Sequence, residues 1–178
     1  MTENTLINRV DQSGIVTIDL EKFYPGFQVF SFDLKDYLFH GLILREKDFR
    51  EALKTHNWMQ YKDGVLCVFC SSDAIIPVWA YMLVSSYAAP VASQIHNGSP
   101  EQWMQYYYHS TIQAMDLSPF VDKKIVIKGC SDKAVPSSAY ATITARLMEV
   151  AQSIMYGEPC STVPVYKKAK TVETNPLS

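Results

Sequence analysis

Three Cys-Ser pairs recur along the chain, beginning at Cys70, Cys130 and Cys160. The first two pairs follow apolar runs typical of strands, and each precedes a proline and an Ala-Tyr pair that begin a helical pattern. Residues just beyond the carboxyl ends of neighbouring parallel strands lie at the same edge of a sheet. A thiol that precedes a helix N-terminus also has a lowered pKa, which favours the thiolate that binds metals. We therefore predict that the three sulfur atoms meet in one site.

Three thiolates in one place repel one another unless a cation or a cluster holds them. Zinc usually takes four ligands, and thiolates also hold iron and iron–sulfur clusters. The predicted cofactor is therefore a metal ion, zinc or iron, or an iron–sulfur cluster bound by Cys70, Cys130 and Cys160. Asp73 is the favoured fourth ligand because it lies three residues after Cys70 in the same loop. The other candidates for the fourth position are Asp132, His40 and Glu158.

Two alternatives to a metal site stay open for these cysteines. A free cysteine is often a small buried hydrophobe, and in that case the three residues only pack in strand-to-helix turns. Cys130 or Cys160 could instead be the nucleophile of a thiol-dependent enzyme without metal. Cys67 is excluded from the site: it lies in mid-strand, three positions before Cys70, where the two side chains point to opposite faces. We predict that Cys67 belongs to the core.

The two apolar runs that precede the first two Cys-Ser pairs predict the fold class. Val65–Phe69 and Ile125–Lys128 are continuous enough to be strands covered on both faces. Each is followed by a helical pattern, from about Ala74 and from about Val135. Two such units predict a parallel pair joined by a right-handed crossover. The likeness of the two Cys-Ser elements covers only a dozen residues, and we interpret it as a local repeat rather than a duplicated domain.

The remaining segments predict further strands and helices. Gly14–Leu20 and Phe27–Phe32 have the pattern of strands, which we pair as a hairpin. Glu46–His56 is an amphipathic helix, and Ser99 with Gln102 three residues later marks the start of another. The predicted fold is α/β, with a mixed sheet that contains at least one parallel βαβ pair and helices packed on it. We assign residues 1–166 to a single domain and residues 167–178 to a polar C-terminal tail.

Composition and charge exclude several classes of partner. The chain has 178 residues, 48% of them hydrophobic and 19% charged, as in an ordinary globular domain. A net charge of −2 with scattered basic residues gives no reason to expect nucleic acid. Ala74–Gln94 carries no charge, but two prolines and several polar residues interrupt it, so we expect no membrane span. Without a recognisable signal peptide we expect a cytoplasmic protein with reduced thiols.

The aromatic segment Glu101–Met115 offers a third functional class. Three consecutive tyrosines follow Trp103 on a predicted helix, without the basic residues that nucleic-acid stacking requires. Such a face can pack on the sheet or on another subunit. A non-catalytic interaction protein that forms a homodimer through this helix is therefore a further alternative.

Four stretches give the chain a family resemblance: Gly41–Arg50, Asp73–Met82, Lys128–Ser131 and Ser153–Pro164. With these stretches the chain resembles an uncharacterised bacterial family, domain of unknown function 2480, over nearly its whole length up to Lys167. The resemblance carries over no activity. It implies a genomic setting near iron–sulfur assembly components, and so iron–sulfur assembly proteins as partners. Three cysteines lie in these stretches and one lies outside: Cys70, Cys130 and Cys160 inside, Cys67 outside.

Overall fold

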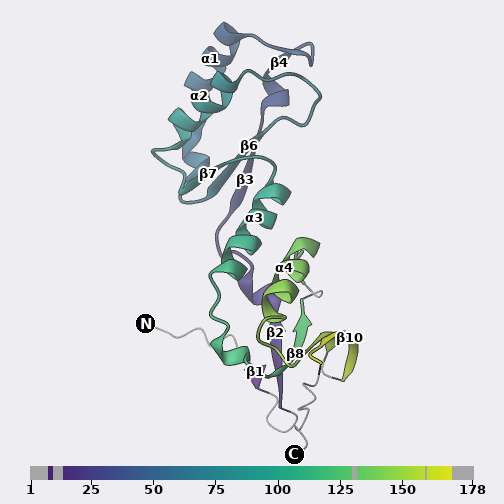
Figure 1. Ribbon diagram of the computed structural model, residues 1–178. Coiled ribbons are helices and arrows are strands. Elements are labelled where there is room, and N and C mark those ends of the chain that lie inside the picture. The colour runs from purple at the N-terminus through teal and green to yellow at the C-terminus, as the bar shows by residue number, and fades with distance from the viewer. Residues whose placement is uncertain (1–7, 10–13, 130–131, 159, 170–178) are drawn as a thin grey trace, which may run out of the picture. The chain divides into compact units, whose positions relative to one another are not determined.

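The chain forms two compact units in the computed structural model, which describes residues 8–9, 14–129, 132–158 and 160–169 (Figure 1). Unit 1 comprises Met1–Tyr24 and Tyr107–Ser178, and unit 2 comprises Pro25–Tyr106. Unit 2 is thus inserted in the sequence between two parts of unit 1. The predicted α/β class is confirmed, with parallel strands and helices in both units. A single domain over residues 1–166 stays a prediction.

Unit 1 contains a five-stranded sheet in the order β1-β2-β8-β9-β10. The three central strands run parallel, and β1 and β10 join the two edges antiparallel to their neighbours. Helix α4 (Ser137–Leu147) connects β8 to β9 and buries Ala139, Ile143 and Leu147, four residues apart. The strands are β1 (Asn8–Arg9), β2 (Ile15–Asp19), β8 (Lys124–Lys128), β9 (Ser153–Glu158) and β10 (Ser161–Lys167).

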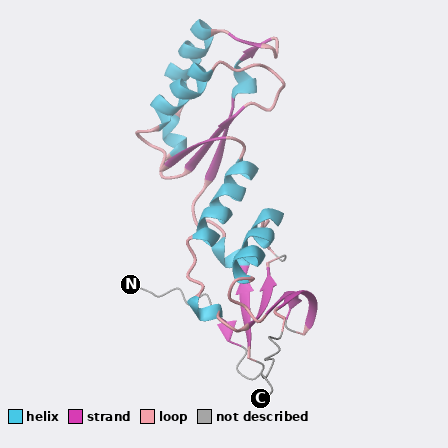
Figure 2. Ribbon diagram, viewed as in Figure 1, coloured by secondary structure: helices cyan, strands magenta, loops and turns pink. Residues whose placement is uncertain are grey.

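Unit 2 contains a three-stranded parallel sheet in the order β3-β6-β7 (Figure 2). Helix α1 (Glu46–Thr55) lies between β3 and β6 in the chain, and α2 (Val78–Ala88) lies between β6 and β7. Helix α3 (Pro100–Gln113) follows and contains the boundary between the units. The strands are β3 (Val29–Asp33), β6 (Val65–Phe69) and β7 (Gln94–Asn97), with a small hairpin of β4 (Leu38–Phe39) and β5 (Ile43–Leu44).

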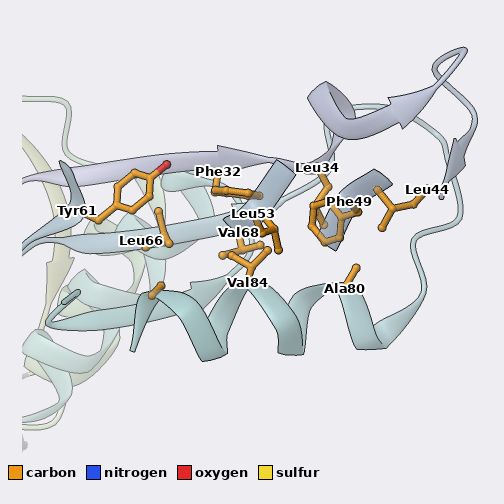
Figure 3. Close-up of a cluster of buried hydrophobic side chains, with 11 residues drawn as sticks. Phe32, Leu34, Leu44, Phe49, Leu53, Tyr61, Leu66, Val68, Ala80 and Val84 are labelled. Carbon is orange, nitrogen blue, oxygen red and sulfur yellow. The ribbon is translucent and has the colours of Figure 1, made fainter. Parts of the chain in front are cut away.

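The core of unit 2 forms between its sheet and its first two helices (Figure 3). Phe49 and Leu53 of α1, and Ala80 and Val84 of α2, are fully buried or nearly so at helical spacing. Burial of these apolar side chains supplies the main stabilisation of the unit. The strand side chains of this core include Phe32, Leu66 and Val68.

The two units share one ββαβ arrangement. Strands β6 and β8 start 59 positions apart, at Val65 and Lys124, and α2 and α4 start 59 apart, at Val78 and Ser137. The third strands, β7 and β9, begin at Gln94 and Ser153 with the same offset, and pair with β6 and β8 in the same register. The repeat is therefore far longer than the dozen residues predicted.

Backbone details follow the same offset. Asp63 and Asp122 both have positive φ, 58° and 54°. Their N–H groups donate to the carbonyls of Val91 and Val150, at 3.1 and 2.8 Å. The offset of 59 pairs Cys70 with Gly129 rather than with Cys130. The Cys-Ser turns are thus not equivalent positions of the two units.

The predicted start of one helix is confirmed, and one predicted strand pairing is wrong. Helix α3 begins as predicted, since the Ser99 N–H donates to Gln102 Oε1 at 2.8 Å and the Gln102 N–H donates to Ser99 Oγ at 3.3 Å. The predicted hairpin of β2 with β3 is wrong, because β2 pairs with β8 and β3 pairs with β6 in separate sheets. Strands β7 and β10 were not predicted. Among the described residues, no helix has the length and apolar character needed to cross a membrane.

Candidate functional site

The predicted three-cysteine site is wrong. Cys70 follows β6 in unit 2, Cys160 lies between β9 and β10 in unit 1, and Cys130 lies outside the described residues. Strands β6 and β8 belong to different sheets, so their carboxyl ends do not form one edge. Within the described part of the chain, no group of three or more His, Cys, Asp and Glu side chains could hold a metal ion. The metal or iron–sulfur function therefore finds no site among the residues that the structure describes.

The individual residues of that prediction have local roles. Cys70 is half-buried with its Sγ 3.2 Å from Ser72 Oγ, and Asp73 is exposed in the same loop. Cys160 is exposed. Cys67 is fully buried, as predicted, and burial raises the pKa of its thiol to about 11.

The remaining candidates for a fourth ligand do not all belong to one unit. His40 is exposed in the turn between β4 and β5 of unit 2. Asp132 belongs to unit 1, where its N–H donates to Glu21 Oε1 at 3.3 Å. Glu158 ends β9 and accepts a hydrogen bond from Lys128. Of these, only Glu158 takes part in the charged cleft described next.

A charged cleft of about 190 Å³ lies at the carboxyl ends of β2, β8 and β9 in unit 1. Lys128 Nζ lies 3.3 Å from Glu158 Oε1 and 3.8 Å from Asp19 Oδ2, so one ammonium bridges the ends of three parallel strands. In open α/β sheets ligands bind outside the carboxyl ends of the strands. We call this the strand-end cleft; it is lined by Asp19, Glu21, Lys128, Gly129, Tyr156, Gly157 and Glu158.

Two glycines shape the backbone of the strand-end cleft. Gly129 has φ +146°, and its carbonyl accepts a hydrogen bond from the Tyr140 hydroxyl at 2.6 Å. Gly157 has φ +120°, and a Cβ there would lie 2.5 Å from the backbone oxygen of Ser161. Both positions therefore require glycine for backbone reasons. The charged side chains are held on a fixed frame.

Unit 2 provides an internal comparison for the charges of this cleft. Asp33 occupies the position of Asp19, and each accepts a hydrogen bond from the N–H two residues on, at 3.0 and 3.1 Å. In Asp33 burial opposes ionisation, but hydrogen bonds from Ser71 and Lys35 outweigh it and lower the pKa. The aspartate is therefore a structural cap of the turn after the first strand.

The Lys128–Glu158 pair has no counterpart in unit 2. With the offset of 59, Phe69 stands where unit 1 has Lys128, and Ser99 stands where it has Glu158. Strand β7 ends at Asn97, before Ser99, but β3, β6 and β7 form the same parallel pairing as β2, β8 and β9 without these two charges. We conclude that the ion pair is a feature of the site and not a requirement of the fold.

An open apolar groove of about 590 Å³ adjoins α4 in unit 1. Ile127 and Tyr156 are register partners on β8 and β9, so they lie on the same face of the sheet, and Tyr140 of α4 contacts Tyr156 edge-on at 5.8 Å. Tyr156 lines both the groove and the strand-end cleft. We call this the α4 groove; its lining is Ile127, Tyr140, Ala141, Thr144, Ala145, Met148, Met155, Tyr156 and Val165.

The aromatic helix α3 is largely used for packing within each unit. Trp103 is buried, contacts Phe27 edge-on at 5.7 Å and donates through Nε1 to Gln94 at 3.2 Å. Tyr108 is fully buried and donates to the carbonyl of Leu20 at 3.1 Å. Its most buried aromatic residues therefore stabilise the fold, and a homodimer stays a prediction.

Sequence reasoning missed the strand-end cleft for an identifiable reason. Lys128 ends the predicted strand Ile125–Lys128, whose other residues are apolar, and Glu158 was named only among the candidates for a fourth ligand. Charged residues at the carboxyl ends of predicted parallel strands were the available signal. The α4 groove could not be predicted, because it requires β10, which had no recognisable strand pattern.

These features define an α/β protein of two ββαβ units in which one unit carries a charged cleft at its strand ends. The chain belongs to the family described as Protein of unknown function (DUF2480), whose match covers residues 4–168, as the resemblance predicted. Neither a curated protein nor a solved structure matches the chain. The cytoplasmic location and the iron–sulfur assembly partners stay predictions.

Proposed function

We propose that the protein binds a small organic cation in the strand-end cleft of unit 1. The observation that carries this proposal is the Lys128–Glu158 pair, which spans the ends of parallel strands in unit 1 and is replaced by Phe69 and Ser99 in unit 2. Binding sites of α/β sheets lie at this edge. The Glu158 carboxylate, which the fold does not need, is more simply explained by a ligand than by stability.

The charge of the cleft determines the ligand's sign. Of the described residues that line it, Asp19, Glu21 and Glu158 carry carboxylates and Lys128 carries an ammonium. The net field therefore favours a cation. A ligand ammonium would replace Lys128 as the partner of Glu158, and Lys128 would compete with it.

This competition predicts that removing Glu158 and removing Lys128 change the affinity in opposite directions. Ethylammonium chloride is titrated into the full chain and followed by NMR shifts of backbone amides, with sodium chloride as the ionic-strength control. We expect Glu158→Gln to weaken binding roughly three- to tenfold, because a carboxylate is lost, and Lys128→Met to strengthen it, because a competitor is lost. Weakening by both substitutions, or no saturable shift at residues of the cleft, would refute the proposal.

A further inference from the structure

The α4 groove and the strand-end cleft meet at Tyr156, which lines both. The α4 groove is apolar and open, and the strand-end cleft is small and charged. A volume of about 590 Å³ is in the range of small-molecule sites, roughly 300–1,000 Å³. The two together have the form of a site for one molecule with a charged end and an apolar chain.

Apolar side chains remain exposed around the α4 groove. Met148, Tyr156 and Val165 are exposed by 46, 39 and 53%. Ala141 and Ala145 of α4 are small, which leaves the space open between the helix and the β9–β10 hairpin. Exposed apolar surface that lines a concavity favours an apolar ligand.

Unit 2 again provides the comparison. Met82 occupies the position of Ala141, and Asn97 occupies the position of Tyr156. Unit 2 has no strand equivalent to β10 among its described elements. The groove is therefore particular to the unit that also carries the charged cleft.

We infer that the ligand is a cationic amphiphile, whose ammonium lies in the strand-end cleft and whose alkyl chain lies in the α4 groove. This inference rests on the proposed function, because the cleft supplies the charge complementarity that selects a cation over other occupants. The chain length that binds best is set by the groove.

The test uses n-alkylammonium chlorides from ethyl to octyl, with the full chain labelled at its methionine methyl groups. Met148 and Met155 line the groove, whereas the exposed Met59 and Met82 belong to unit 2 and are internal controls. We expect affinity to rise about two- to fourfold for each added methylene beyond butyl. We also expect saturable shifts at Met148 and Met155 only.

A matched pair of variants places the alkyl chain. Ala141→Met introduces the residue that unit 2 has at this position and narrows the groove; Ser138→Met adds the same side chain at an exposed position of α4 outside it. We expect Ala141→Met to reduce the gain per methylene below about 1.5-fold while ethylammonium affinity changes less than twofold. For Ser138→Met we expect the same affinity gain per methylene as for the unsubstituted protein.

The outcomes separate the two proposals. Ethylammonium binding at the cleft with no gain from chain length overturns the amphiphile and leaves the cation site standing. If affinity rises with chain length but Glu158→Gln does not weaken it, the claim that the cleft binds the ammonium is overturned. The same holds if sodium octyl sulfate binds equally well. Shifts of Met148 and Met155 that depend on protein concentration without ligand would show that a second copy covers the groove, which also overturns the inference.

Discussion

Removing the Lys128 ammonium tests whether the charged cleft is dispensable for folding. Lys128→Met keeps the apolar stem of the side chain and removes the pairs with Glu158 at 3.3 Å and Asp19 at 3.8 Å. The three side chains are 34, 57 and 22% exposed, and ion pairs so exposed contribute about 0–1 kcal/mol each. We therefore expect the free energy of unfolding to fall by less than about 2 kcal/mol.

The assay must separate the two units. All three tryptophans lie in unit 2, at Trp58, Trp79 and Trp103, so their fluorescence follows unit 2 in urea while far-UV circular dichroism follows both. Lys124→Met, at the amino end of the same strand and outside the cleft, is the control. A loss above about 3 kcal/mol for Lys128→Met alone would show that the pair holds the strand ends together. The argument that the charge pair serves ligand binding, because unit 2 folds without it, would then fail.

Three further predictions concern local structure. Gly157→Ala places a Cβ 2.5 Å from the Ser161 oxygen at a residue with φ +120°, so the free energy of unfolding in urea should fall by about 2–4 kcal/mol. The control Gly26→Ala, where the space is open, should lower it by less than about 1 kcal/mol. Ser99→Ala removes the N-cap of α3 and should lower the free energy of unfolding by about 1 kcal/mol in the same assay. Ser99→Thr should retain most of the stability, because threonine can also cap the helix. Burial lowers the pKa of His56 below its ordinary 6.5, so the unfolded chain binds the proton more readily. Stability is therefore full above about pH 6.5 and falls as the pH is lowered through that value and the folded pKa, and His56→Gln should flatten this dependence in urea midpoints at pH 5–8.

Local signals in the sequence predicted the covered strands, the helix starts and the fold class. Val65–Phe69 is a continuous apolar run because β6 lies between β3 and β7 and is covered on both faces, with its first four residues buried. Ser99 with Gln102 predicted the start of α3, because both hydrogen bonds of that motif form within four residues. Signals of this kind need no knowledge of the remaining chain.

Pairings between distant segments were not predictable in the same way. Strands β2 and β3 are neighbours in the chain, but β2 pairs with a strand more than 100 residues later, because unit 2 is inserted between them. Strand β10 contains Pro164, which usually argues against a strand, yet it lies at the sheet edge and is bulged next to this residue. The shared cysteine site assumed that β6 and β8 belong to one sheet, and no local pattern distinguishes one sheet from two.

The insertion of unit 2 predicts an asymmetry in how the two units unfold. When unit 2 folds, Phe27 and Trp103 come into contact, with ring centroids 5.7 Å apart, which closes a loop of 76 positions. This loop separates β2 from β8 in the chain, so the pairing of these strands requires its ends to be close. An unfolded insert of this length would cost unit 1 roughly 4 kcal/mol of closure entropy. Loss of unit 2 should therefore destabilise unit 1, whereas loss of unit 1 leaves the loop of unit 2 intact.

Leu53→Ala tests this asymmetry against Lys47→Ala on the exposed side of the same helix. Leu53 is fully buried, so its truncation should destabilise unit 2 by about 2–5 kcal/mol. We expect the Trp fluorescence transition and the methyl signal of Met155 in unit 1 to move together to lower urea. Gly157→Ala should move only the Met155 transition. If Leu53→Ala shifted the fluorescence transition and left that of Met155 unchanged, the two units would fold independently, and the closure argument would be wrong because unit 1 tolerates an open insert.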